Sequence, residues 1–370
     1  MIIDLFAGAG GLSLGAARAG FQLASAVELD PFAIETHKKN FPNSVHIAED
    51  VSIFTGARLL EMSGVAPGEL TGLIGGPPCQ GFSTIGRREV TDSRNNLFSH
   101  FFRLVNETRP AFFLAENVPG ILDSQYDEIR KNAISQLDLN VYTVLAPITV
   151  QANLYGAPTT RTRIFFIGFD PLRFQHNLEI TDFLPPADTI QTTVGEAFRG
   201  LPARIDCRWL SEEAGWKRYT PLAPGFFNDR VQGQVPNSVG DPIALNRYFE
   251  SGEVSGCMGT KHSEAVKARY GALKFGQTDK ISKSVRLNPE GFCPTLRAGT
   301  GRDKGSYQAV RPIHPTSPRV ITPREAARLQ GFPDWFVFHR TKWHSFRQIG
   351  NSVSPIVSEF VLSCIHDKLR

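Results

Sequence analysis

The sequence lacks a hydrophobic run long enough to cross a bilayer, because its longest apolar stretches, such as Ala111 to Ala115, are only strand-sized. Its start lacks the basic segment and cleavage site of a secretory signal, and Ile2 to Phe6 already has the character of a strand. Its five cysteines are an odd number spread along the chain, which does not suggest a disulfide framework. We therefore expect a cytoplasmic protein in a reducing compartment, without a membrane partner.

A large excess of charge of either sign is absent as well. The chain carries 40 Lys and Arg against 36 Asp and Glu, so its formal net charge is only +4. The distribution is less even, because the segment from Val254 to Arg311 holds eleven Lys or Arg and four Asp or Glu. Such a segment suits a surface that binds a polyanion, but a solvated basic face without a partner explains the charge equally well.

The organisation of the chain changes once. Up to about residue 170, short apolar strands alternate with helical stretches, which is typical of a doubly wound, mainly parallel α/β sheet. Near Pro185-Pro186 this alternation ends, and the composition becomes rich in Gly, Pro, Asn and Ser. We predict that residues 1–185 and 341–370 form one domain, and that residues 186–340 form a smaller, irregular, β-rich domain with a hinge.

Two helices can be placed near the end of the chain. Thr322 precedes Pro323 and stands three residues before Glu325, the pattern of a capping box with proline at the first helical position. The segment from Pro355 to Leu369 has the pattern of one amphipathic helix.

A glycine-rich turn follows the first strand, in the run Asp4-Leu5-Phe6-Ala7-Gly8-Ala9-Gly10-Gly11. Such turns present backbone N–H groups to a ligand, in dinucleotide sites and in adenosylmethionine sites alike. Glu28 ends the second strand ~20 residues later, where a carboxylate accepts hydrogen bonds from ribose hydroxyls. Asp50 ends the next strand region and is placed to meet the adenine amino group. The alternative is that both acids are merely exposed residues at strand ends.

The spacing of the glycines separates the two cofactors. Gly8, Gly10, Gly11 and Gly15 do not follow the Gly-x-Gly-x-x-Gly pattern that packs against a pyrophosphate. Adenosylmethionine carries no pyrophosphate. The spacing therefore favours a methyl donor over NAD.

Three further segments carry chemically useful side chains. Cys79 lies in the turn Gly75-Gly76-Pro77-Pro78-Cys79-Gln80-Gly81-Phe82-Ser83, directly after an apolar strand. A single cysteine is usually a small buried hydrophobic residue, but this turn would project its thiol at the carboxyl end of the sheet. Glu116 ends another apolar strand, and Arg161 and Arg163 precede a third. The alternatives are a helix-capping acid and two surface charges.

Together these groups meet the needs of one reaction. C5 of cytosine is a poor nucleophile, and it becomes reactive when a thiolate adds to C6. The site then needs an activated cysteine, a proton donor at N3 and a cation near O2. Cys79, Glu116 and the two arginines are the candidates for these three roles.

The ordered set of motifs resembles that of the DNA (cytosine-5)-methyltransferase family. The resemblance rests on the glycine-rich run, Glu28, Asp50, Pro77-Pro78-Cys79-Gln80, Glu116-Asn117-Val118, Arg161-Thr162-Arg163, Arg319 to Pro333, and Gln348-Ile349-Gly350-Asn351-Ser352-Val353. Any one motif could arise by chance, whereas the ordered set is specific. The resemblance implies the fold of adenosylmethionine-dependent methyltransferases, S-adenosyl-L-methionine as methyl donor, no metal, and a target-recognition domain in residues 186–340.

The resemblance also implies roles for single residues. Cys79 would attack C6, and Glu116 would bind N3 of a cytosine flipped out of double-stranded DNA. Arg163 would touch the base, and Arg161 would support the flipped nucleotide and its phosphate. The cofactor site would be lined by Phe6, Gly8, Gly11, Glu28, Leu29, Asp50, Val51, Pro78, Asn351 and Val353. Thr159 stands where the family usually has Gln, so we expect one supporting hydrogen bond to be missing or mediated by water.

Two segments are expected to contact DNA. The segment from Gly81 to Asn96 corresponds to a loop that closes over DNA in the family. Its candidate residues are the infiltrating Ser83 and Ile85, the phosphate-binding Arg87 and Arg88, and Arg94 as a further DNA contact. The segment from Cys293 to Gly301 resembles the family's recognition segment, in which Thr295 would position the protein at the target base. Arg297 and the nearby Arg302 would read guanine. A glycine-rich hairpin that only shapes the domain is the alternative.

Other functions are weighed against this one. The family's tRNA-acting branch lacks so large a recognition region. A DNA-binding regulator with a vestigial site would not need the intact set of chemical residues, and a nicotinamide dehydrogenase leaves Pro77 to Gln80 unexplained. The sequence does not separate a partner of a cognate restriction endonuclease from a solitary epigenetic methyltransferase. A monomer is favoured over a homodimer.

Overall fold

The structure is a computed structural model that describes residues 1–78, 96–207, 215–233, 235–299 and 310–370. Several of the predicted site residues lie outside these ranges, and their predicted roles stay predictions: Cys79, Ser83, Ile85, Arg87, Arg88, Arg94 and Arg302.

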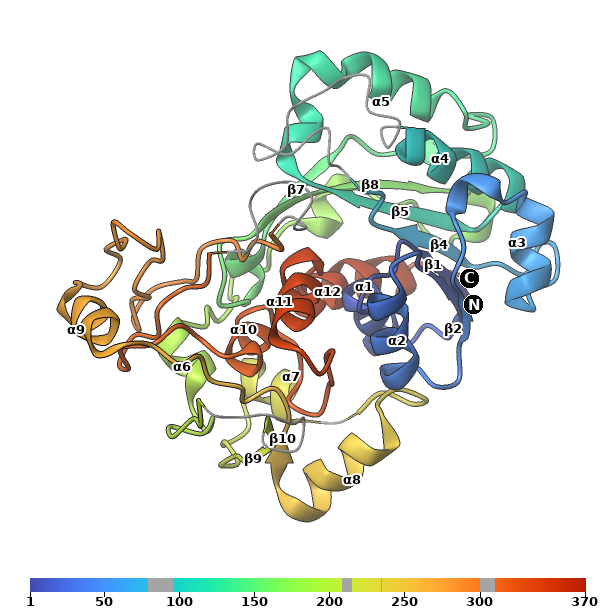
Figure 1. Cartoon of the computed structure of the whole chain (residues 1–370). Helices are drawn as coiled ribbons and strands as arrows, with labels where there is room; N and C mark the ends of the chain where they lie inside the picture. Colours follow the sequence, from blue (N-terminus) through green and yellow to red (C-terminus); the bar gives the residue numbers. More distant parts are fainter. Residues whose placement is uncertain (79–95, 208–214, 234, 300–309) are drawn as a thin grey trace.

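The centre of the molecule is an eight-stranded sheet with the order β3-β2-β1-β4-β5-β8-β6, in which β7 also pairs with β8 (Figure 1). Its strands are Ile2–Leu5 (β1), Leu23–Val27 (β2), Val45–Ile47 (β3), Gly72–Gly75 (β4), Phe112–Asn117 (β5), Thr143–Val144 (β6), Ile148–Gln151 (β7) and Thr162–Phe169 (β8). Strands β1 to β5 pair in parallel, whereas β8 runs antiparallel to its three neighbours. The predicted mainly parallel sheet is confirmed, with an antiparallel end.

The strand order reverses at β1, because β2 and β3 lie on one side of it and β4 and β5 on the other. Ligands of open α/β sheets bind at such a switch point, outside the carboxyl ends of the strands. The glycine-rich turn follows β1, Glu28 follows β2, and Pro77 follows β4. The topology therefore brings the predicted cofactor residues to one edge of the sheet.

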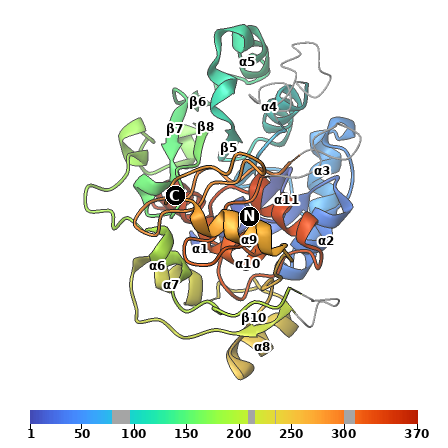
Figure 2. The same ribbon diagram turned by 60° about the vertical axis from the view of Figure 1, so that its left-hand side comes forward.

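Two layers of helices cover the sheet, because successive side chains of a strand point to opposite faces. Ile2 belongs to a hydrophobic cluster with residues of α1 and α12, and Ile3 to a cluster with residues of α3, α4 and α5. The first layer contains α1 (Gly11–Arg18), α2 (Pro31–Asn40) and α12 (Pro355–His366), and the second contains α3 (Gly56–Ser63), α4 (Asn96–Thr108) and α5 (Asp127–Ile134) (Figures 1 and 2).

Residues 186–340 are less rich in strands than expected. Their described part contains one pair of short strands, β9 (Lys217–Arg218) and β10 (Glu253–Val254), besides isolated bridges. Its helices are α6 (Val194–Phe198), α7 (Phe226–Gln232), α8 (Pro242–Ser251), α9 (Glu264–Ala272) and α10 (Pro323–Leu329). One hydrophobic cluster joins Val254 and Leu329 of this region to Ile2 of the sheet. The division into two domains stays a prediction.

The helices near the end of the chain begin as predicted. Thr322 Oγ1 accepts a hydrogen bond from Glu325 N, and the Glu325 carboxylate accepts one from Thr322 N, which confirms the capping box of α10. The amphipathic segment forms α12, which ends at His366 rather than at Leu369. Between them lies α11 (Lys342–Asn351). Among the described residues, no helix is both long and apolar enough to span a membrane.

Candidate functional site

The glycine-rich turn after β1 is held by a carboxylate. Glu28 Oε2 accepts a hydrogen bond from Gly8 N at 2.8 Å, and its Oε1 accepts one from Asp30 N at 2.8 Å. Burial raises the pKa of Glu28. Gly8 has a φ of +56°, and a Cβ built on it would meet nothing within 4 Å. The turn therefore borders open space that a ligand can enter, and Glu28 lies beside it.

The start of α1 lies directly against the segment that follows α11. A Cβ on Gly11 would stand 2.4 Å from the carbonyl oxygen of Val353, so this position has room only for glycine. Asn351 and Val353 are thereby brought beside the turn, although more than 300 residues separate them from it in the chain. Asn351 is exposed, whereas Val353 is buried.

The remaining predicted cofactor residues lie after the carboxyl ends of neighbouring strands. Asp50 Oδ1 accepts a hydrogen bond from Ser52 N at 2.8 Å, and Val51 is buried in the core behind it. Leu29 is 61% exposed and therefore accessible to a ligand. Phe6 and Pro78 are partly exposed. An open glycine turn, flanking carboxylates and accessible apolar side chains suit an adenosyl group with its ribose and adenine.

A buried chain of polar side chains lies behind the turn, and no motif of the sequence indicates it. Ser13 Oγ donates a hydrogen bond to Asp4 Oδ2 at 2.6 Å and lies 3.0 Å from His37 Nε2, while His37 Nδ1 lies 2.9 Å from His46 Nε2. Burial raises the pKa of Asp4 to about 7 and lowers that of His46 to about 4. His37 and Phe41 also limit the space at Gly10, where a Cβ would collide with the Phe41 ring and stand 3.2 Å from the His37 ring.

The two predicted base-binding residues are paired. Arg163 Nε on β8 lies 2.6 Å from Glu116 Oε1 on β5, and both side chains are largely buried. The contact is an ion pair without hydrogen-bond alignment, and Glu116 Oε1 is a buried oxygen that forms no hydrogen bond within the described part of the chain. A Cβ on Gly76 would lie 3.0 Å from Glu116 Oε2, so the carboxylate lies at the turn that leads to Cys79. This environment suits a planar ligand that supplies the missing hydrogen bonds.

Arg161 occupies a different environment from Arg163. It is 3% exposed, and its guanidinium donates to the carbonyl oxygens of Leu296 at 3.4 Å, Gly350 at 2.9 Å and Asn351 at 3.2 Å. Its expected support of the flipped nucleotide and its phosphate stays a prediction. Arg161 joins three segments that lie far apart in the sequence.

Thr159, which stands where the family usually has Gln, forms a hydrogen bond of its own. Its side chain is fully buried, and its Oγ1 donates directly to the carbonyl oxygen of Cys293 at 3.0 Å. The backbone reinforces this contact, because Thr160 N donates to Cys293 O and Cys293 N donates to Pro158 O. The absence of the supporting bond that Gln would form stays a prediction.

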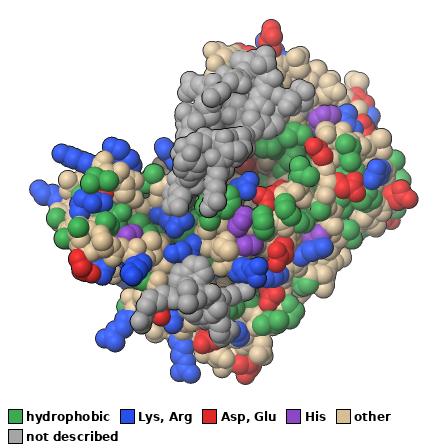
Figure 3. Space-filling view, in the orientation of Figure 1, with side chains coloured by type: hydrophobic (Ala, Val, Ile, Leu, Met, Phe, Trp, Pro, Cys, Tyr) green, Lys and Arg blue, Asp and Glu red, His purple; other side chains and the backbone are tan. Residues whose placement is uncertain are grey.

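The predicted recognition residues Thr295 and Arg297 are exposed on either side of the buried Leu296. Lysine and arginine side chains gather on the lobe that contains α9 (Figure 3). The exposed lysines between residues 254 and 299 are Lys261, Lys267, Lys274, Lys280 and Lys283. This surface carries the positive charge expected of one that binds a polyanion.

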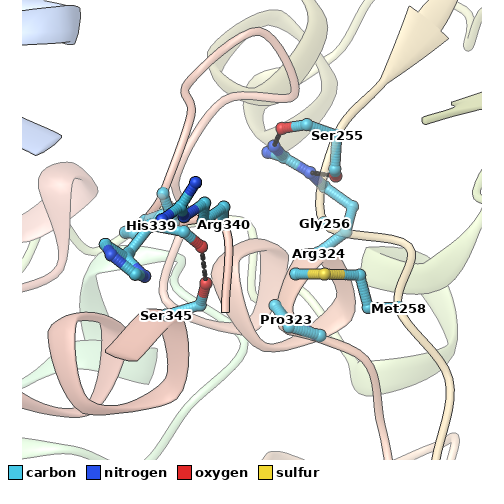
Figure 4. A pocket seen from close by; sticks show the side chains of 9 residues that line it. Ser255, Gly256, Met258, Pro323, Arg324, His339, Arg340 and Ser345 are labelled. Atoms are coloured by element: carbon cyan, nitrogen blue, oxygen red, sulfur yellow. Dashed lines mark hydrogen bonds between the residues drawn. The ribbon is translucent and has the colours of Figure 1, made fainter. Parts of the chain in front are cut away.

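A small pocket lies between α10 and the segment that precedes α11, and none of the predicted site residues lines it. Arg324 forms one wall, where it donates to both the carbonyl and the hydroxyl oxygen of Ser255 (Figure 4). Ser345 donates to the carbonyl oxygen of His339 on the opposite side. The hydrogen bonds around it are internal to the fold, which indicates a structural gap rather than a binding site.

The fold and the site define an α/β enzyme with a glycine-rich turn after its first strand and a paired acid and guanidinium at the same edge of its sheet. Residues 1–367 match the family described as C-5 cytosine-specific DNA methylase, and the chain belongs to this family. The type II methyltransferase M.XorII of Xanthomonas oryzae pv. oryzae is 39% identical, over 100% of this chain and 85% of that protein. M.DdeI of Desulfomicrobium norvegicum is 32% identical, over 97% of this chain and 86% of that protein.

Solved structures agree with this assignment. A candidate DNA modification methyltransferase encoded within an E. coli prophage is 50% identical and superimposes with a TM-score of 0.89, over 99% of this chain and 98% of that one. The S. pombe Dnmt2 methyltransferase shares the fold, with a TM-score of 0.62 at 18% identity. The predicted fold class and family are therefore confirmed.

Proposed function

We propose that the protein transfers a methyl group from S-adenosyl-L-methionine to C5 of a cytosine flipped out of double-stranded DNA, at one short specific sequence. The pairing of Glu116 with Arg163 carries the proposal. It brings a carboxyl group and a guanidinium side by side at a sheet edge, and the carboxylate lies beside Gly76, three residues before Cys79 in the sequence. Cytosine N3 and O2 are separated by one carbon atom, so adjacent acidic and cationic groups suit them.

The reaction begins when the Cys79 thiolate adds to C6 and a bond forms between Sγ and C6. Glu116 donates a proton to N3, Arg163 stabilises the charge at O2, and C5 thereby becomes electron-rich. S-adenosyl-L-methionine supplies an electrophilic methyl group for C5. Loss of the C5 proton to solvent and of Cys79 from C6 then restores the aromatic ring, and the N3 proton returns to Glu116.

The cofactor would lie across the carboxyl edge of the sheet. Glu28 would bind the ribose hydroxyls, and Asp50 the adenine amino group. Phe6 and Leu29 would cover the adenine faces with apolar surface. Gly8, Gly11, Val51, Pro78, Asn351 and Val353 would complete the site.

Residues 186–340 would read the DNA sequence, with Thr295, Arg297 and Arg302 at base edges. Ser83, Ile85, Arg87, Arg88 and Arg94 would contact the DNA from the loop after Cys79. The relatives' names as type II methyltransferases favour a cognate restriction endonuclease as the functional partner. A cytoplasmic monomer fits this role.

Methyl transfer can be tested with tritiated S-adenosyl-L-methionine and plasmid DNA, for the wild type and Cys79→Ala. We expect label in DNA with the wild type and none with the variant, because alanine has no thiol with which to attack C6. Bisulfite sequencing of DNA from expressing cells would identify the methylated site. Label that persists in Cys79→Ala would overturn the covalent mechanism, and label that enters tRNA but not duplex DNA would overturn the substrate.

A further inference from the structure

We infer that Arg161 is a positioning residue that couples the cofactor site to the DNA-recognition segment, which here means residues 293–298. This inference rests on the proposed function, because it assigns ligands to both sites. It gives Arg161 a role through protein carbonyls rather than through contact with the nucleotide.

The junction consists of three segments that meet at one guanidinium. Arg161 Nη1 donates to Leu296 O of the recognition segment and to Gly350 O at the end of α11, and its Nη2 donates to Asn351 O. Asn351 is also a proposed cofactor residue. One rigid, planar side chain therefore holds the recognition segment against the cofactor segment.

Gly350 shows how closely the two segments approach. A Cβ on it would lie 2.7 Å from Ala298 N and 2.8 Å from the carbonyl carbon of Arg297. Both are backbone atoms, so a side chain at position 350 would displace the recognition segment. The contact leaves little freedom for one segment to move without the other.

The first residue of the recognition segment is bound to the residues that precede β8 and include Arg161. Thr159 Oγ1 and Thr160 N both donate to Cys293 O. Residues 293–298 thus contact both the start of β8 and the end of α11. Strand β8 begins at Thr162 and carries Arg163, which pairs with Glu116.

Helix α11 extends the junction to the adenosyl side of the cofactor site. Arg347 forms an ion pair with Asp30 at 2.9 Å, and Gln348 donates to Phe32 O at 2.8 Å. Asp30 is the residue whose N–H group binds Glu28. A ligand that orders Glu28, Asn351 and Val353 therefore orders α11 and, through Gly350 and Arg161, the recognition segment.

Such coupling is reciprocal. Each ligand orders a junction that the other also needs, so the second ligand loses less conformational entropy on binding. A bound cofactor product should strengthen DNA binding, and DNA should strengthen product binding by the same factor. The Arg161 fork and the packing at Gly350 act together in this junction, so the loss of either should uncouple the two segments.

Hydrogen exchange tests this without relying on turnover. S-adenosylhomocysteine should slow amide exchange in residues 293–298 of the wild type by at least ~3-fold, although none of these residues belongs to the proposed cofactor site. We call this slower exchange of residues 293–298 the transmitted protection. In Arg161→Lys the transmitted protection should disappear, while protection at Gly8 and Glu28 remains. Gly350→Ala, which disturbs the same junction from α11, should give the same loss.

Arg324→Lys is the matched control. Arg324 is equally buried and donates to the carbonyl oxygens of Ser255, Pro333 and Phe336, but it contacts neither residues 293–298 nor residues 350–351 through a hydrogen bond. The substitution Arg324→Lys should lower the free energy of unfolding without removing the transmitted protection. If Arg161→Lys does not fold, Gly350→Ala decides the outcome against the same control.

The two proposals fail in different ways. If S-adenosylhomocysteine protects no part of the wild type, the proposed cofactor site is wrong. If it protects Gly8 and Glu28 but not residues 293–298, or if Arg161→Lys and Gly350→Ala keep the transmitted protection, the coupling role of Arg161 is wrong. The reciprocal measurement is the Kd for DNA that carries the methylation site found by bisulfite sequencing, with and without S-adenosylhomocysteine. The product should lower this Kd in the wild type and change it by only about 1-fold in Arg161→Lys.

Discussion

Arg163 Nε lies 2.6 Å from Glu116 Oε1, across a pair of strands that run antiparallel. The register places Glu116 opposite Phe165 and Asn117 opposite Ile164, so Arg163 extends just beyond the end of β5. The antiparallel arrangement brings the end of β5 and the start of β8 to the same edge of the sheet. An acid and a cation from distant motifs thereby form one site.

Replacing Glu116 by Gln should abolish most activity, because the amide keeps the shape of the carboxyl group but cannot protonate N3. We expect kcat to fall by ~10²–10⁴-fold. Single-turnover methylation of duplex DNA with tritiated cofactor measures the chemical step directly. Glu128→Gln, which changes an exposed acid of α5, serves as the control and should leave the rate unaltered. A Glu116→Gln enzyme with near-normal kcat would show that another group protonates the base.

Replacing Glu28 by Gln should weaken cofactor binding rather than slow the chemical step. The carboxylate holds the N–H groups of Gly8 and Asp30 and is the proposed ribose ligand. An amide can accept only on its oxygen, so KM for S-adenosyl-L-methionine should rise ~10-fold or more with kcat largely kept. Isothermal titration with S-adenosylhomocysteine provides a second measure. Glu35→Gln on the exposed face of α2 is the matched control, and an unchanged product Kd in Glu28→Gln would contradict the assignment.

Asp4 should make stability depend on pH. Its ordinary pKa is 3.8, and burial raises the pKa to about 7 in the folded protein. Between these values the folded protein holds a proton that the unfolded chain has released, so the contribution of Asp4 to the free energy of unfolding falls as pH rises. Asp4→Asn cannot titrate but can still accept the hydrogen bond from Ser13. Between pH 4 and pH 7, the free energy of unfolding of Asp4→Asn should therefore increase by more than about 1 kcal/mol relative to that of the wild type.

Urea unfolding of both proteins at several pH values tests this prediction. Burial lowers the pKa values of His37 and His46, so their contributions to the free energy of unfolding rise with pH, opposite to that of Asp4. They are present in both proteins and cancel when the two curves are subtracted, to the extent that the substitution leaves them unperturbed. His46→Gln, which removes the outermost member of the chain, provides a check on that cancellation. Parallel pH curves for the wild type and Asp4→Asn would refute the role of Asp4.

Replacing Arg297 by Ala should relax sequence recognition. Its side chain is exposed beside the buried Leu296, as a base reader requires. The loss of a bidentate contact with guanine costs ~1–3 kcal/mol for the correct site and little for other DNA. Lys280→Ala, which removes an exposed charge from the same region, should weaken both kinds of DNA alike. Competition binding with duplexes that contain or lack the methylation site separates the two effects. An equal loss of affinity for both duplexes in Arg297→Ala would show that Arg297 contacts phosphates rather than a base.

Much of the fold and site could be predicted from the sequence. The alternation of strands and helices, the capping box at Thr322 and the cofactor acids all follow from local patterns, because each depends on neighbours within a few residues. The pairing of Glu116 with Arg163 could be expected once both were placed at strand ends. The buried Asp4–Ser13–His37–His46 chain could not, since nothing local links a serine of α1 to histidines further along the chain.

The sequence by itself determined the family, through the order of its motifs and the residue types that each of them presents. It did not determine the surroundings of the two arginines in the Arg161-Thr162-Arg163 motif. Arg161 and Arg163 are alternate residues in one motif, yet Arg163 lies beside Glu116 and Arg161 is buried among the carbonyls of Leu296, Gly350 and Asn351. Only the tertiary structure decided this, because a guanidinium is directed by the oxygens that packing brings to it, and these come from segments far away in the chain.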